Sequence, residues 1–372
     1  MYGQIREDTL FIIFYAGVTA MAMMASYYLL LRRGNAFAKD VTPPRRLRRW
    51  AAVFLGVFAL NHVWYMPIFF LSSSEDVRLC DLVGGLLDSV TIFPLAIVVL
   101  LTMLQDRRRP LWPVAVMFAP LVVGNAWSVA TLSYDILPVI YVYFLLICTS
   151  FIIYMVRALR QYGRWLRDSF ADLEHKEVWQ SFVVLAIMLL VFVAYTFIYD
   201  GRAYLYAMQV VSALLICYLP WRVETLSDLS IPVPMEDVAE GGVAPRNAED
   251  GDLSLSMRNN IGPLLKQHCE EPQLYLQYDI TLTQLAQMIG TNRLYLSRHF
   301  SGQGMTYNAY INGLRIQHFV NLYHEAMATH QSVTAQQLAI QSGFRSYNTF
   351  SVAFKKMKGT TVTEWMLSQI SA

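Results

Sequence analysis

The sequence predicts an all-α protein with two parts: an N-terminal bundle of seven transmembrane helices and a C-terminal domain with two helix-turn-helix units in tandem. Composition is the first support. The chain is 55% hydrophobic and only 15% charged, whereas soluble domains are about 25% charged, and the shortage of charge lies in residues 1–222. The second support is a ten-residue pattern that occurs twice, at Thr281–Gly290 and at Thr334–Gly343.

Seven apolar stretches in residues 1–222 are long enough to cross a bilayer, which takes about 20 helical residues. They lie near residues 10–31, 51–71, 83–104, 111–130, 137–156, 179–199 and 203–220. The first carries no charged residue and is too long for the apolar core of a signal peptide. We therefore expect it to be retained as a span.

Basic residues indicate the orientation of this predicted bundle. Lys and Arg concentrate in the segments 32–50, 105–110 and 157–178, whereas the loops on the other side hold only Arg6, Arg78 and Arg202. Because basic loops remain in the cytoplasm, we expect the N-terminus outside the cell. An odd number of spans then places the chain after residue 222 in the cytoplasm.

Four polar residues fall inside the predicted spans: Asn61, His62, Asp88 and Asn125. Polar side chains are costly in a bilayer and often functional, so they form a candidate ligand pocket that faces outward. The alternative is that they make hydrogen bonds between helices, or that Asp88 is solvated near the membrane surface. The loop 157–178 has two interpretations as well: a helix on the inner membrane surface, or a span that extends into the cytoplasm.

Residues 223–255 have the composition of a linker. They contain eight acidic residues and a single basic one, Arg246, together with several prolines and glycines that discourage regular structure. We expect a flexible acidic tether. An alternative is that its negative charge covers a basic surface and inhibits the domain that follows.

The two repeats each predict a helix with defined ends. Each begins with threonine and glutamine three residues apart and ends in glycine: Thr281, Gln284 and Gly290, then Thr334, Gln337 and Gly343. The threonine and glutamine form a capping box that satisfies free N–H groups at the helix start, and glycine suits the left-handed residue that ends a helix. A second helix follows each glycine, which is typical of a helix-turn-helix unit.

In the first unit, Asn292 is expected to cap the second helix, while Leu296 and Phe300 point inward. The exposed face then carries the candidate DNA-contacting residues Arg293, Leu294, Ser297 and Arg298. Arginine is the best reader of guanine in the major groove, so Arg293 and Arg298 are the strongest candidates, although either could instead bind phosphate.

In the second unit, Ser346 is the expected cap, and Phe350 and Phe354 point inward. The residues left for the DNA groove are Tyr347, Asn348 and Ser351, and those suited to phosphates are Arg345, Lys355, Lys356 and Lys358. Residues 256–372 hold nine basic and five acidic residues, the modest positive charge that a duplex-binding domain needs.

Residues 270–366 resemble the DNA-binding domain of AraC/XylS-type transcription regulators. The resemblance lies in a connecting-helix motif and a closing signature, made of Gly304, Tyr310, Ile311, Leu314 and Arg315, and of Gly343, Phe344, Phe350, Phe354, Lys355, Lys356, Gly359, Glu364 and Trp365. It implies that the two recognition helices enter successive major-groove segments about one turn apart. The whole architecture is similar to membrane-bound regulators of this family, which implies a bacterial cytoplasmic membrane with the C-terminal domain in the cytoplasm.

Three positions depart from the family pattern: Val362 replaces a usual proline, Phe319 a small residue, and Val352 an arginine of the second recognition helix. The last change makes the second reading face less polar. We therefore expect the first unit to dominate base reading.

The sequence thus predicts a membrane-anchored, sequence-specific transcription regulator that responds to a signal sensed by its transmembrane domain. Double-stranded DNA and the lipid bilayer are the expected partners, with a homodimer and an unidentified effector left open. We expect no enzyme activity, cofactor or metal, because no phosphate-binding loop, HExxH motif or zinc-like cysteine spacing occurs. The alternative is a membrane receptor or transporter whose helical tail binds a protein.

Overall fold

The computed structural model describes residues 8–32, 34–38, 41–184, 186–187, 202–229 and 261–370. The chain divides into two compact units. The N-terminal unit comprises Met1–Tyr162 and His175–Val233, and the C-terminal unit comprises Gly163–Glu174 and Pro234–Ala372. The described residues are predominantly helical, and one isolated antiparallel bridge joins Phe170 to Thr281.

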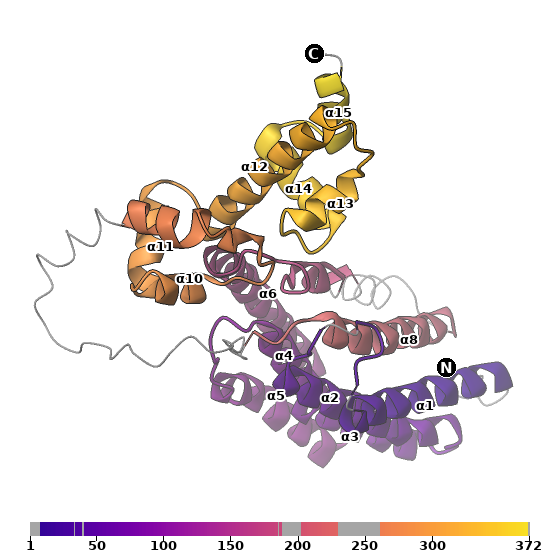
Figure 1. The fold of residues 1–372 in the computed structure, drawn as a ribbon. Helices are drawn as coiled ribbons and strands as arrows, with labels where there is room; N and C mark the ends of the chain where they lie inside the picture. The colour runs from indigo at the N-terminus through magenta and orange to yellow at the C-terminus, as the bar shows by residue number, and fades with distance from the viewer. Residues whose placement is uncertain are drawn as a thin grey trace, which may run out of the picture. The chain divides into compact units, whose positions relative to one another are not determined.

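The N-terminal unit is a helical bundle (Figure 1). Its helices are α1 (Thr9–Leu31), α2 (Arg45–Tyr65), η2 (Met66–Phe69), α3 (Ser74–Val90), α4 (Ile92–Met103), α5 (Trp112–Thr131), α8 (Arg202–Thr225) and α6 (Leu137–Ser169) as far as Tyr162. Helix α1 packs against α2 and α8, while α3 packs against α5. The Ser26 hydroxyl of α1 donates to the Ala52 carbonyl of α2 at 2.8 Å, which ties the first two helices together.

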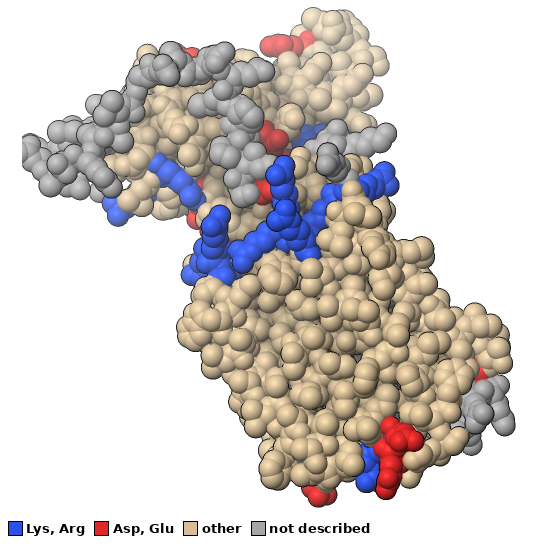
Figure 2. All heavy atoms as spheres, turned by 90° about the horizontal axis from the view of Figure 1, so that it is seen from below, with Lys and Arg blue, Asp and Glu red and all other residues tan. Residues whose placement is uncertain are grey.

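Much of the apolar surface of this unit faces outward rather than into a core. Leu10, Leu31 and Val123 are each more than two-thirds exposed. Within the described residues, six helices are long and apolar enough to cross a membrane. Figure 2 shows the corresponding surface as almost uncharged, with most of its Lys and Arg gathered at one end of the unit and a few, mainly acidic, residues at the other. A soluble domain would not leave so much apolar surface in water.

The observed helices refine the predicted spans. The third begins earlier than predicted, at Ser74, and breaks at Thr91 between α3 and α4. Pro94 explains the break, because proline lacks the N–H that would bond to the carbonyl of the preceding turn. The predicted span 179–199 lies for the most part outside the described residues.

Two loop predictions also change. Helix α6 continues without interruption to Ser169, so this part of segment 157–178 extends the helix of a predicted span, in agreement with one of the two interpretations. The predicted linker starts too early, because α8 continues to Thr225 and Glu224 is fully buried. The Glu224 carboxylate accepts hydrogen bonds from the Tyr28 hydroxyl at 2.6 Å and the Ala36 amide at 3.0 Å, which holds this residue in the bundle. Linker residues 230–255 lie outside the described part of the chain.

The C-terminal unit has two hydrophobic cores joined by one long helix. Its elements are η3 (Lys266–Glu270), η4 (Leu274–Leu276), α10 (Leu282–Met288), α11 (Arg293–Gly302), α12 (Tyr307–Ala328), α13 (Ala335–Gln341), α14 (Tyr347–Lys358) and α15 (Val362–Ile370). Helix α12 contributes Ile311 to the first core, with α10 and α11, and Phe319 to the second, with α13, α14 and α15. Each core therefore belongs to one helix pair. Figure 1 shows the two pairs toward opposite ends of α12.

Arg315 lies on α12 between the two cores and is 1% exposed. Its guanidinium donates to the carbonyls of Tyr275 at 2.7 Å and Gln277 at 2.8 Å, and it lies over the Phe344 ring at 5.6 Å. Burial lowers the pKa of Arg315 to about 10. The side chain thus connects η4 with the second core.

Candidate nucleic-acid interface

The first helix pair, α10 and α11, has the local geometry that its sequence predicts. The Thr281 hydroxyl accepts a hydrogen bond from the backbone N–H of Gln284, and the Gln284 side-chain oxygen accepts one from the backbone N–H of Thr281. These two bonds complete the capping box. Gly290 has φ of +72° and turns the chain between the helices. Asn292 then caps α11 by accepting from the Tyr295 amide at 2.9 Å.

This turn presents one face of α11 to solvent. Leu296 and Phe300 are buried in the first core, as expected. Of the four candidate DNA-contacting residues, Arg293, Leu294 and Arg298 are exposed and Ser297 is half-buried. The structure thus places the predicted reading residues on an outward face that begins at the helix N-terminus.

The second pair, α13 and α14, repeats the arrangement with tighter packing. The Thr334–Gln337 capping box is complete, and Ser346 caps α14 by accepting from the Thr349 amide. Gly343 has φ of +86°, and a β-carbon added there would lie 2.7 Å from the Leu276 backbone. Glycine is therefore required at this turn for conformation and for space.

The reading face of the second pair is less polar than that of the first. Tyr347 is half-buried and packs against the second core, whereas Asn348 is exposed. The Ser351 hydroxyl donates to the Asn348 carbonyl of its own helix, and Val352 is 64% exposed. Only Asn348 combines a polar side chain with full exposure among the three groove candidates.

The predicted phosphate-binding residues lie at both ends of α14. Lys355 and Lys356 are exposed in its last turns. Arg345, just before the helix, is half-buried and lies over the Tyr278 ring at 5.7 Å. This stacking orients the guanidinium without neutralising its charge.

A segment distant in sequence contacts the beginnings of both second helices. We call Gly163–Glu174 the docked segment, since it belongs to the C-terminal unit although the chain on either side belongs to the N-terminal unit. Arg293 donates to the Ser169 hydroxyl at 2.7 Å. The Glu174 carboxylate accepts from the hydroxyls of Ser346 at 2.8 Å and Thr349 at 2.9 Å.

Sequence reasoning did not identify Ser169 or Glu174 as part of this site. Their partners are more than a hundred residues away along the chain, and no local pattern relates them. The only sequence signal was the mixture of arginines, acids and aromatic residues in the segment 157–178.

In the N-terminal unit, two of the four polar residues predicted to form a pocket, Asn61 and Asp88, contact each other. The Asn61 amide donates to the Asp88 carboxylate at 2.8 Å, and the Tyr65 hydroxyl donates to the same carboxylate at 2.8 Å. A β-carbon at Gly84 would lie 2.4 Å from the Tyr65 ring, so glycine admits this ring to α3. These contacts match the alternative of hydrogen bonds between helices.

His62 and Asn125 take part in different contacts. The His62 ring stacks on the Tyr15 ring with centroids 4.8 Å apart. The Asn125 amide donates to the Leu121 carbonyl one turn earlier in α5. The structure therefore brings Asn61 and Asp88 together, and a β-carbon at Gly85 would lie 3.7 Å from the Asn125 Oδ1, so Asn125 faces the same helix α3 that carries Asp88. The common pocket stays a prediction.

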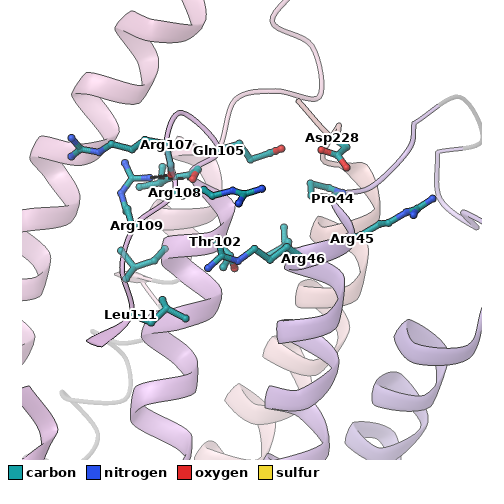
Figure 3. Close-up of a pocket in the computed structure, with 13 residues that line it drawn as sticks. Pro44, Arg45, Arg46, Thr102, Gln105, Arg107, Arg108, Arg109, Leu111 and Asp228 are labelled. Carbon is teal, nitrogen blue, oxygen red and sulfur yellow. Dashed lines mark hydrogen bonds between the residues drawn. The ribbon is translucent and has the colours of Figure 1, made fainter. Parts of the chain in front are cut away.

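A cavity of about 630 Å³ lies elsewhere in the N-terminal unit, at its arginine-rich end. It separates the beginning of α2, with Arg45 and Arg46, from the loop between α4 and α5, with Arg107, Arg108 and Arg109. Figure 3 shows Arg46 and Arg108 beside the space between these two segments, whereas Arg45 and Arg107 point away. Sequence reasoning had used these arginines only to orient the bundle.

Five arginines and one acid, Asp228, line this arginine cavity, so its charges are not balanced. Arg109 is buried and pairs with the Asp106 carboxylate at 2.8 Å. Arg46 and Arg108 are exposed, and neither has an acidic partner within 4 Å among the described residues. The arrangement is chemically suited to a small anion.

Comparison with known proteins supports a DNA-binding regulator. A family model described as a helix-turn-helix domain matches residues 285–368. This match supports an AraC-like helix-turn-helix regulator for the C-terminal part of the chain. No curated protein and no solved structure matches the chain.

Proposed function

We propose that this protein is a membrane-anchored, sequence-specific transcription regulator whose C-terminal unit carries two helix-turn-helix units in tandem. One observation carries the proposal. Each of the two helix pairs combines a capping box, a left-handed glycine turn and a side-chain cap on the second helix. The second pair lies inside the matched residues 285–368, and the first pair begins just before them. A single helical hairpin could have this form by chance, but two copies in one unit are typical of an AraC-like DNA-binding domain.

In this proposal, α11 and α14 are the recognition helices, and their N-terminal residues enter the major groove. Arg293 and Arg298 read bases, because a guanidinium makes two hydrogen bonds to guanine O6 and N7. Lys355 and Lys356 bind phosphates, which position the domain without specifying sequence. The apolar Val352 leaves α14 with fewer base contacts than α11.

The N-terminal unit is proposed to lie in a bacterial cytoplasmic membrane with its arginine-rich end toward the cytoplasm. The six described apolar helices support this anchoring, and basic residues at one end agree with the rule for cytoplasmic loops. We further propose that this unit senses an effector and that the protein has no enzyme activity. Pairing of two chains would set the spacing of their DNA-binding domains.

The proposal is tested with the full-length protein in nanodiscs and a library of genomic duplexes. We expect a specific duplex to be selected and its affinity to fall steeply with salt concentration. Arg298→Ala should reduce discrimination between this site and mismatched sites by about 1–3 kcal/mol. Lys356→Ala should weaken binding to all duplexes and reduce the salt slope by about one unit.

Lys266→Ala is the matched control for loss of positive charge. Lys266 is exposed in η3, outside both helix pairs, so its removal should leave site discrimination unchanged. The alternative function, a receptor or transporter with a protein-binding tail, predicts no salt-sensitive duplex binding by the full-length protein. That result would refute the proposed function.

A further inference from the structure

The docked segment, Gly163–Glu174, occupies positions that the proposed function assigns to DNA. It is seated in the C-terminal unit rather than lying on its surface, because Ala171 is 2% exposed and Asp172 is 3% exposed. Ala171 is part of the first hydrophobic core. Burial of this kind indicates a specific contact.

At the first helix pair, the segment is held by backbone and side-chain hydrogen bonds. The Ala171 amide donates to the Ile280 carbonyl at 3.3 Å, and the Asn308 side chain donates to the Ala171 carbonyl at 2.6 Å. These contacts bring Ser169 to Arg293, the first residue of α11. The Arg293 guanidinium cannot bind Ser169 and reach a base edge in the major groove at the same time.

At the second pair, Glu174 lies at the N-terminus of α14. Its carboxylate accepts from the hydroxyls of Ser346 and Thr349, the cap and third residue of this 12-residue helix. A helix N-terminus favours negative charge and commonly binds phosphate. The carboxylate therefore stands where a DNA phosphate would be expected.

We propose that the docked segment and DNA exclude each other, so that the segment inhibits DNA binding until it is released. This inference rests on the proposed function and adds the regulation of the same site. The segment is continuous with a predicted span, because α6 runs unbroken from Leu137 to Ser169. A movement of this helix, caused by an effector, would withdraw Ser169 and Glu174 together and free both recognition helices.

The first test measures duplex affinity of the full-length protein in nanodiscs. Glu174→Ala should raise the affinity roughly tenfold, since it removes a charge-assisted contact that competes with DNA. Glu177→Ala is the matched control, because Glu177 is the next acid in the chain and belongs to the N-terminal unit. An affinity of Glu174→Ala equal to that of the wild type would overturn the inference.

The second test locks the segment in place with a disulfide. Phe170 and Thr281 form an antiparallel bridge, so cysteines at both positions are close enough to be oxidised to a disulfide. The reduced form of the same variant is the control, because both the reduced and the oxidised form lack the Thr281 cap. Oxidation should weaken duplex binding at least tenfold, and equal binding by the two forms would contradict the inference.

These outcomes separate the two proposals. If the wild type or a variant binds a specific duplex but neither Glu174→Ala nor oxidation changes the affinity, only the inhibitory role of the segment fails. If no form binds any duplex, the proposed function fails and the inference fails with it.

A second inference comes from the arginine cavity of the N-terminal unit and does not depend on DNA binding. The α2 N-terminus beside it has no side-chain cap, so its free N–H groups add to the positive field. Thr102 lines the same cavity and adds a neutral polar group. Gln105 lines it too, but its side chain bonds to the Ser227 carbonyl and the Leu229 amide. Arg46 and Arg108 approach it from the two opposing segments (Figure 3).

We infer that this cavity binds a phosphate group. Basic pockets between helices at the cytoplasmic membrane surface commonly bind anionic lipid headgroups, and free phosphate has the same chemistry. The probes are nanodiscs of phosphatidylcholine alone, the same nanodiscs with phosphatidylglycerol, and inorganic phosphate. The readout is the thermal midpoint of the full-length protein.

The anion should raise the midpoint of the wild type, and the double variant Arg46→Ala, Arg108→Ala should lose this response. Arg49→Ala, an exposed arginine of the same helix outside the cavity, should retain it. A response to phosphatidylglycerol alone would identify a lipid headgroup, and a response to inorganic phosphate would identify a soluble ligand. No response to either probe, or an equal response of the double variant and the wild type, would overturn this inference.

Discussion

The two turn glycines of the repeats allow a stringent test of the C-terminal unit, because they occupy equivalent positions but different surroundings. Gly290 and Gly343 have φ of +72° and +86°. A β-carbon at Gly290 would meet no atom within 4 Å, whereas one at Gly343 would lie 2.7 Å from both the Cα and the carbonyl oxygen of Leu276. Substitution by alanine therefore separates backbone strain from steric overlap.

The expected magnitudes follow from these two terms. Left-handed backbone costs an alanine about 1–2 kcal/mol, so Gly290→Ala should reduce the free energy of unfolding by that amount. Gly343→Ala carries the same cost and also about 1–3 kcal/mol of overpacking. The second variant should therefore lose about 2–5 kcal/mol, because the Leu276 backbone cannot rotate away as a side chain could.

Urea-dependent labelling of Cys269 provides the assay. This thiol is fully buried in the first core, so it reacts with a maleimide only when the C-terminal unit opens. The full-length protein in detergent micelles is labelled over a range of urea concentrations, and the Cys269 peptide is quantified by mass spectrometry. Equal losses for the two variants would refute the steric argument, and a smaller loss for Gly343→Ala would refute the assigned packing.

Three further predictions concern the interior of the same unit. Arg315→Met should cost about 2–4 kcal/mol of unfolding free energy, measured by the same labelling, because the buried Tyr275 carbonyl and the partly buried Gln277 carbonyl lose their charged donor. Phe319→Ala should cost about 3–5 kcal/mol, since it leaves a cavity in the second core, and Phe319→Leu should cost clearly less. Burial raises the pKa of the Cys269 thiol to about 12, so the folded state retains a proton that the unfolded state releases from about pH 9. Stability should thus be lost as the pH rises between these values, by about 1.4 kcal/mol per unit, and Cys269→Ala should lack this part of the pH dependence in urea titrations.

Sequence by itself determined the elements whose causes are local. The capping boxes, the left-handed Gly290 and Gly343, and the caps Asn292 and Ser346 all occur as predicted. These features depend on residues within one or two turns of each other, so their spacing carries the information. Long uncharged stretches were equally readable, because crossing a bilayer requires about 20 apolar residues in succession.

Tertiary structure decided which distant residues meet. Asn61 donates a hydrogen bond to Asp88 while His62 stacks on Tyr15, although Asn61 and His62 are adjacent in sequence. Neighbouring residues of a helix point about 100° apart, and which neighbour each one faces depends on how the helices pack.

The docked segment is the clearest case of this limit. Glu174 lies 172 residues before Ser346, and the short docked segment mixes apolar and charged residues without a pattern that would assign Glu174 a partner. Hydrogen bonds between such residues depend on positions set to within a few tenths of an ångström by the surrounding cores. For this reason the sequence could indicate the two helices that we propose to read DNA, whereas only the folded chain reveals the segment that contacts both of them.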